Sequence, residues 1–152
     1  RLTPAIQECE RIVSGVALTG PATATLTPEP IYAKALAAVV SSLQAARARA
    51  RKEMSTGSSV AGVAGAASGL ASRMSAAANS LAALQAPQLV APAGTALADA
   101  LRRSGQAYSA LAAAARSEIL TEYEAARSAV SGAESRVDAV LMNFALLGYG
   151  AA

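Results

Sequence analysis

The sequence predicts an all-α fold: an antiparallel up-down-up-down four-helix bundle with a short extra N-terminal helix, forming a single domain over residues 1–152. Hydrophobic residues make up 53% of the chain but aromatic residues only 3%, so the apolar content is mostly alanine, the strongest helix former. Apolar residues recur at alternating steps of three and four, as on one face of a helix. Proline and glycine breaks, together with a turn near residues 116–121, would divide the chain into four segments of about 27 residues, matched in length as such a bundle requires.

The first segment is expected to form the short extra helix. Thr3 would cap it and Pro4 would occupy its first turn. Its apolar side would comprise Leu2, Ile6, Cys9, Ile12 and Val13. Cys9 is the only cysteine, so it cannot form an intrachain disulfide and is interpreted as a small buried residue. Residues 14–27 follow as a linker.

The second segment begins with a strong helix-start signal. Thr27, Pro28 and Glu29 combine a capping side chain, a first-turn proline and a first-turn acid. The helix is expected to end near Met54, before a tight turn over residues 55–58. The apolar face predicted for it carries Tyr32, Leu36, Val39, Leu43, Ala46 and Ala50.

The third segment has the most regular pattern, and its spacing indicates a coiled-coil-type seam. The seam consists of Val60, Val63, Ala67, Leu70, Met74, Ala77, Leu81 and Leu84. Gly62, Gly65 and Gly69 lie in the first half of this helix, where each lowers helix propensity by up to about 1 kcal/mol. We therefore expect them to mark a close approach of a neighbouring helix or a partner-helix groove. A stretch at residues 85–93, rich in proline, then interrupts the chain.

The fourth segment contains a shift of phase. Its first seam comprises Leu97, Leu101, Ser104, Tyr108, Leu111 and Ala115. A second seam in a different phase comprises Ile119, Tyr123, Ala126, Val130, Ala133, Val137, Val140 and Phe144. One interpretation is a turn near residues 116–121, with Thr121 and Glu124 as a capping box for a last helix. The alternative is one long helix over residues 92–147 that completes the bundle of a second copy in an exchanged dimer.

Segment length favours the turn and a monomer, because a turn yields four matched segments. The absence of glycine, proline and asparagine between Ala112 and Glu122 favours the continuous helix. The turn is the prediction adopted here.

The residues that usually carry catalysis or bind metal are missing. Histidine is absent, which removes the commonest general base and metal ligand. Glu118 and Glu122, like Glu134 and Asp138, lie four residues apart, but the di-iron pattern of helical bundles also requires histidine. These acids are expected to be solvated and paired with arginines. No phosphate-binding, nucleophile or zinc motif occurs, so we expect no enzyme, no metal and no cofactor.

The densest basic run comprises Arg47, Arg49, Arg51 and Lys52. In an antiparallel bundle it would lie near residue 118, so we expect it to face Glu118, Glu122 and Glu124. Net charge is only +3 and no aromatic residue lies near these cations, so no nucleic-acid partner is expected. Residues 54–72 are uncharged but contain many serines, and the helical seam accounts for them better than a membrane span does.

These features favour a non-enzymatic bundle with a protein-interaction or structural role, as the soluble part of a secreted or envelope protein. The alternative is a sensor or ligand-binding bundle that holds a small apolar molecule between its helices. The residues expected to line such a pocket are Tyr32, Met74, Tyr108, Leu111 and Tyr123. Composition rich in alanine and arginine but poor in lysine indicates a high-GC bacterial source, and an extracytoplasmic location is favoured over a cytoplasmic one.

Overall fold

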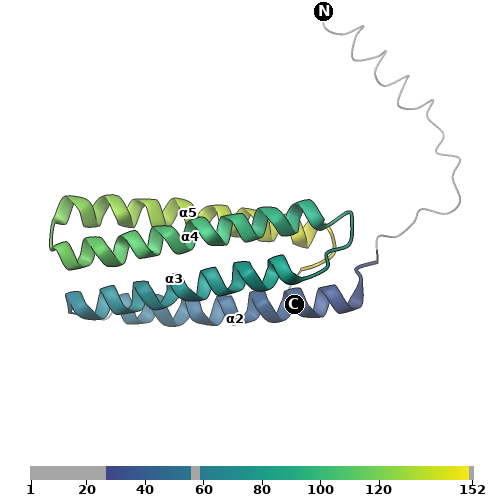
Figure 1. Ribbon diagram of the computed structural model, residues 1–152, viewed down its shortest axis with the longest axis horizontal. Helices are drawn as coiled ribbons and strands as arrows, with labels where there is room; N and C mark the ends of the chain where they lie inside the picture. The colour runs from purple at the N-terminus through teal and green to yellow at the C-terminus, as the bar shows by residue number, and fades with distance from the viewer. Residues whose placement is uncertain (1–26, 56–58, 151–152) are drawn as a thin grey trace, which may run out of the picture.

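The computed structural model describes residues 27–55 and 59–150 (Figure 1). That part of the chain forms four helices and no strand: α2 (Pro30–Ser55), α3 (Val60–Ala83), α4 (Ala91–Ser117) and α5 (Leu120–Leu146). Successive helices run in opposite directions, so the predicted up-down-up-down bundle is confirmed. The short helix expected around Thr3 and Cys9 lies outside the described residues.

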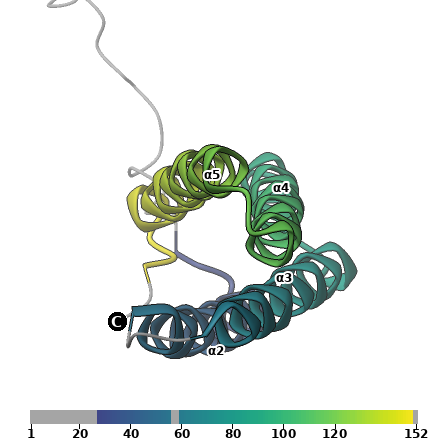
Figure 2. The same cartoon turned by 90° about the vertical axis from the view of Figure 1, so that its left-hand side faces the viewer.

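Packing follows the order of the chain. The backbone of α3 lies against α2 on one side and α4 on the other, and α5 lies against α4. No Cα atom of α2 comes within 8 Å of one in α5. Viewed from one end, the four helices therefore form an open ring with α2 and α5 at its two edges (Figure 2). Side chains, and not close backbone packing, must join these two edges.

The inner faces of the helices form one core. The largest fully buried side chains are Tyr108, Phe144, Leu70, Met74, Leu97, Leu101, Val137 and Ser104. Every residue of the seam predicted before the phase shift, from Leu97 to Ala115, is buried. In α2, however, Val40 and Arg47 occupy inner positions, whereas the predicted Val39 and Ala46 are only half-buried. The inner stripe of a straight helix drifts relative to the strict seven-residue repeat used for the prediction.

Two predicted seam residues lie at one end of the bundle and are exposed. Val60, in the first turn of α3, is 45% exposed, and Ile119 is 48% exposed. The predicted burial of Val60 is therefore wrong. The seam pattern identifies the face of a helix, but it does not show whether a neighbouring helix extends far enough to cover the first turn.

At Gly105, α4 lies close against the backbone of α3. A methyl group there would lie 3.1 Å from the Ala71 carbonyl oxygen and 3.2 Å from Ser75 Oγ, so α3 and α4 pack backbone to backbone. At Gly65 and Gly69 a methyl group would meet nothing within 4 Å, and Gly62 is exposed as well. The predicted close approach of a neighbouring helix at these three glycines is therefore wrong. The side of α3 that carries them faces away from α4, whereas Ala71 and Ser75 face it.

Polar side chains cap the first two helices. α2 begins at Pro30, two residues later than expected, and the Glu29 carboxylate accepts hydrogen bonds from the backbone NH groups of Ile31 and Tyr32. Ser59 caps α3, since its Oγ accepts from Gly62 N at 3.2 Å. Both arrangements satisfy NH groups that have no partner within the helix.

The turn predicted near residues 116–121 is confirmed. Glu118 adopts a left-handed conformation (φ 57°, ψ 18°), and Ile119 is extended before α5 begins. The capping box expected from Thr121 and Glu124 is wrong, because Ile119 occupies the cap position and no side chain caps the helix. The chain thus reverses at Glu118 without a glycine, which costs about 1–2 kcal/mol for a residue that carries a Cβ.

Two alanine substitutions test the assignment of the helix approach. Gly69→Ala should raise the free energy of unfolding by up to about 1 kcal/mol, because alanine is the better helix former and the added methyl group meets open space. Gly105→Ala should lower it by about 1–3 kcal/mol, because the methyl group presses on the α3 backbone. Urea unfolding of both variants checks this, and shifts in the same direction would contradict it.

Candidate functional site

Arg47 is a charged residue on the inner face of α2, and it is only 5% exposed. Its Nε donates to Glu134 Oε1 at 3.1 Å. Its two Nη atoms donate to the Asp138 carboxylate at 2.8 and 3.2 Å. Both acceptors belong to α5, so one guanidinium spans the open side of the ring with three hydrogen bonds.

Glu134 is the acidic centre of the same arrangement and is 9% exposed. Besides Arg47, it accepts a hydrogen bond from Arg51 Nη2 at 2.6 Å and one from Tyr108 Oη at 2.9 Å. The five residues, hereafter the Arg47–Glu134 cluster, therefore join α2, α4 and α5. Two positive and two negative groups balance, with the tyrosine hydroxyl as an additional donor.

Side-chain length explains why charged residues occupy this position. The Cα atoms of α2 and α5 stay more than 8 Å apart, a distance that the long side chains of arginine and glutamate span together. A second link lies at the other end of the two helices, where Tyr149 follows α5. Its ring packs edge-on against Tyr32 with centroids 5.6 Å apart, and its Oη accepts a hydrogen bond from Glu29 N at 3.0 Å.

The pKa shifts keep the cluster in one charge state. Burial raises the pKa of Glu134, but hydrogen bonds from Arg47, Arg51 and Tyr108 outweigh it and hold the pKa below the ordinary glutamate value. Burial, followed by the negative charge of Glu134, raises the pKa of Tyr108. The carboxylate therefore stays ionised and the phenol stays protonated near neutral pH. Such a cluster holds helices together and provides neither a base nor a nucleophile.

Ser104 lies one helical turn before Tyr108 on the same inner face and is fully buried. Its Oγ is the one buried side-chain polar atom in the described chain that has no hydrogen-bond partner. No base in the described chain accepts a hydrogen bond from this hydroxyl, so Ser104 forms no catalytic pair.

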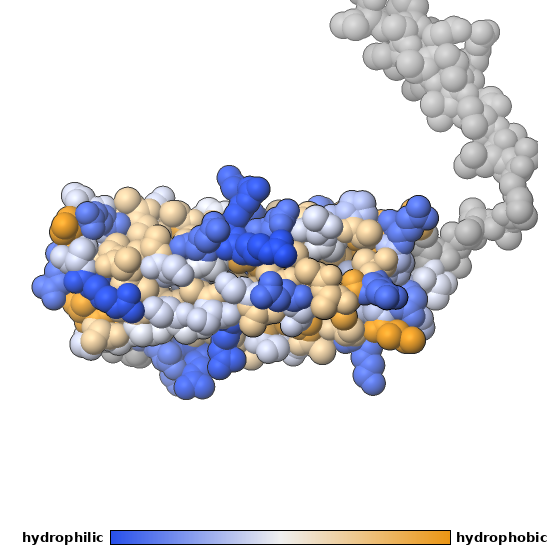
Figure 3. Space-filling view, in the orientation of Figure 1, coloured by the Kyte–Doolittle hydropathy of each residue, from blue (hydrophilic) through white to orange (hydrophobic). Residues whose placement is uncertain are grey.

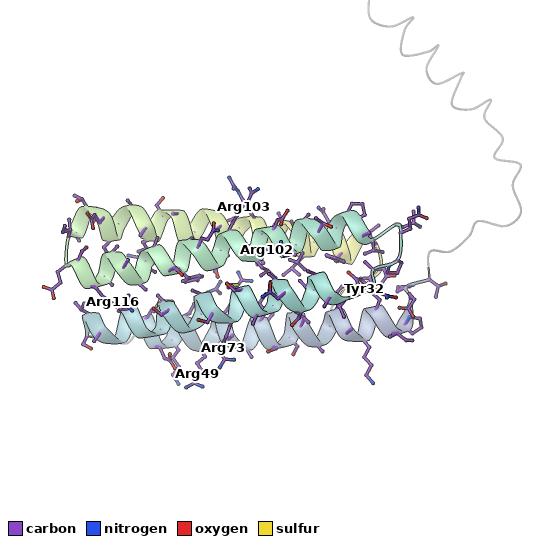
Figure 4. All side chains as sticks on the ribbon, in the orientation of Figure 1. Tyr32, Arg49, Arg73, Arg102, Arg103 and Arg116 are labelled. Atoms are coloured by element: carbon purple, nitrogen blue, oxygen red, sulfur yellow. The ribbon has the colours of Figure 1, made fainter. Side chains whose placement is uncertain are left out.

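The structure distributes the predicted pocket residues along the bundle. Tyr32, Met74, Tyr108 and Leu111 are buried core residues, and Tyr123 is half-buried. Tyr32 lines a hollow of about 300 Å³ at the end where α3 joins α4 (Figure 4). Tyr123 belongs to the opposite end, because α2 and α5 run in opposite directions. The five residues therefore do not surround one shared cavity.

The end of the bundle that contains the α4–α5 turn carries an apolar hollow of about 340 Å³, hereafter the end groove. Its lining residues are Val60, Val63, Ala114, Ala115, Glu118, Ile119, Leu120 and Tyr123. Leu120 is 68% exposed, which adds to the exposure of Val60 and Ile119. Figure 3 shows hydrophobic side chains at this end, on the left of the view. The sequence placed Ile119 on a seam but gave no signal that it stays uncovered.

A second groove, of about 440 Å³, lies on the outer side of α2 and α3. Small residues line it, including Gly65 and Gly69, and Arg49 and Arg73 project along it (Figure 4). Arg49 Nε pairs with Glu53 at 2.8 Å on the surface of α2. Arg73 forms no ion pair with an acid of the described chain.

The predicted partners of the basic run are corrected. Arg47 and Arg51 bind Glu134 and Asp138 in the middle of α5, and not the acids at its start. Arg47 reaches them because it lies on the inner face of α2, a position that the spacing of the basic run did not indicate. Glu134 follows the half-buried Val130 by four residues and precedes Val137 by three, a spacing that could have indicated its burial.

In residues 27–55 and 59–150, no group of three or more histidine, cysteine, aspartate or glutamate side chains is placed to hold a metal ion. No described helix is both long and apolar enough to cross a membrane. No protein-family model, curated protein or solved structure matches the chain.

Removing one half of the buried pair should be costly. Arg47→Met leaves Glu134 buried with fewer donors, and we expect a loss of about 3–5 kcal/mol in the free energy of unfolding. Arg49→Met is the matched control, because the Arg49–Glu53 pair is exposed to water and should contribute little to the free energy of unfolding. Equal losses by urea unfolding would show that the cluster is not the closing contact of the bundle.

Stability should also depend on pH through Glu134. Its pKa is lower in the folded state, so its contribution is present above about pH 4.3, the ordinary pKa, and is lost as the pH falls through the folded value. The difference in unfolding free energy between the wild type and Glu134→Gln should therefore shrink as the pH falls from about 7 to about 3. A difference that stays constant over this range would contradict the assignment.

Proposed function

We propose that this protein is a non-enzymatic helical module that binds a protein partner through the end groove. One observation carries the proposal: Val60, Ile119 and Leu120 are exposed together around an apolar hollow. Grouped exposed hydrophobic residues mark interaction surfaces more often than isolated ones do. The hollow would accept apolar side chains from the partner.

The surroundings of the end groove support this use. Arg116, Glu118 and Glu122 are exposed beside it, so an apolar centre has charged residues at its margin, as in many protein interfaces. Large hydrophobic residues are also exposed at the opposite end of the bundle: Ile31, Leu89, Met142 and Leu146. None of these four lines any of the hollows described above, so the end groove is the better candidate.

The buried polar groups give further support to a binding role over a catalytic one. Glu134 accepts hydrogen bonds from both Arg47 and Tyr108, so these three polar groups are already paired. The hydroxyl of Ser104 is hydrogen-bonded to no base. A nucleophile needs an adjacent base or a lowered pKa. The described chain offers neither arrangement at these residues.

A small apolar ligand is the second candidate for the end groove. Its volume of about 340 Å³ falls in the lower part of the range for small-molecule sites, and Tyr123 contributes an aromatic side chain to it. In this alternative the binding site is the same end groove, but the bound partner is a small molecule instead of a protein.

Site-specific photo-crosslinking distinguishes these candidates. A photoreactive phenylalanine at Leu120 should capture a protein in extracts of the source cells, and the same group at the exposed Ser128 of α5 should not. The capture should be lost when Ile119→Ser and Val60→Ser are added, because they remove the apolar contacts. Equal capture at the two positions would contradict the proposal. Lack of protein capture, with an apolar fluorophore that binds the wild type but not the serine variant, would instead support the ligand.

A further inference from the structure

The turn between α4 and α5 is the place where local sequence and tertiary structure disagree. Glu118 is the one non-glycine residue with a positive φ among the residues that the structure describes. A residue with a Cβ is disfavoured in this conformation, whereas glycine adopts it readily. The turn is therefore strained at a single, identifiable residue.

The sequence around the turn favours a helix. Residues 111–118 read LAAAARSE, and no glycine, proline or asparagine follows before Arg127. No side chain caps the start of α5, so its first NH groups lack the partners that a continuous helix would supply. The reversal of the chain at Glu118 is thus maintained by the packing of α5, and not by local preference.

The half of α5 beside the turn is weakly held. The buried residues of α5 are Glu134, Val137 and Phe144, all in its second half, and none of residues 120–133 is buried. The α5 backbone approaches α4 but comes within 8 Å of neither α2 nor α3, Cα to Cα. Tyr123, Ala126 and Val130 pack against the core in this half but are only partly buried, so α5 is held less tightly near Glu118 than in its second half.

We propose that two copies of this chain exchange α5 by opening the turn at Glu118. α4 and α5 then form one continuous helix, and each α5 packs on the α4 of the other copy. The contacts of Glu134 with Arg47 and Tyr108 re-form between chains, so the buried contacts of α5 are kept. The strain at Glu118 is removed.

Exchange also determines what covers the end groove. The two opened hinge segments cross at a two-fold axis, where Ile119, Leu120 and Val60 of the two copies come together. A second copy already carries the α4 face that fits α5, so no new complementary surface is needed. The inference rests on the proposed use of the end groove as an interaction surface, and it names the partner as a second copy.

The test is the oligomeric state of variants at the hinge. Wild-type protein refolded from urea at high concentration should yield a dimer by size-exclusion chromatography with light scattering. Glu118→Gly should lower the dimer association constant about tenfold for each hinge, because glycine removes the strain of the closed turn. Ala113→Gly is the matched control, since Ala113 is exposed within α4 and helical in both forms, and the change should leave the constant within about threefold.

Subunit mixing separates exchange from simple docking. Cys9 is the only cysteine, so it accepts one fluorophore per chain, and its labelling also prevents an intermolecular disulfide. Energy transfer between differently labelled dimers should develop slowly and accelerate in dilute urea, because α5 must leave its bundle before it can change partner. Rapid mixing, or an equal dimer yield in Glu118→Gly, would overturn the exchange. A wild type that remains monomeric would overturn it too, while crosslinking at Leu120 would still test the proposed function.

Discussion

The hydrogen-bonded ion pair between Arg47 and Glu134 is the contact on which the closure of the bundle depends. Short connections bring each helix against the next, but nothing in the chain order forces the first described helix, α2, against the last, α5. The Cα atoms of the two helices stay more than 8 Å apart, and the long side chains of Arg47 and Glu134 span that distance. Charges removed from water must find partners, and here each of the two makes three hydrogen bonds. That requirement fixes the relative position of α2 and α5.

The position of this cluster determines which half of α5 is held by buried contacts. Together with Val137 and Phe144, it holds the second half of α5, and the contact between Tyr149 and Tyr32 secures the segment that follows. The first half of α5 has no buried residue of its own, so side chains near the α4–α5 turn stay in contact with solvent. The end groove is a consequence of that unequal anchoring. The apolar surface at this end therefore arises from the way α3, α4 and α5 pack around the α4–α5 turn.

Much of the candidate site was beyond the reach of sequence patterns. The seam identified Ile119 and Tyr123 as apolar positions, but it did not show that Ile119 is exposed and Tyr123 only half-buried beside Val60. The basic run was recognised, but it was paired with the wrong acids, because periodicity does not show which charged residue turns inward. The role expected for the glycines of α3 also depended on tertiary structure. Close packing of α3 and α4 does require a glycine, but that glycine is Gly105 of α4, which lies against Ala71 of α3.

The sequence by itself determined the helices, their lengths and their alternating directions, because alanine content, seam spacing and proline positions act over a few residues. It also determined that the chain turns near Glu118, although only through the matched lengths of the segments on either side. Tertiary structure decided the open ring, the inward rotation of Arg47 and the left-handed conformation of Glu118. Those features follow from side chains that meet across distances of 83 to 91 residues in the chain, which no local pattern encodes.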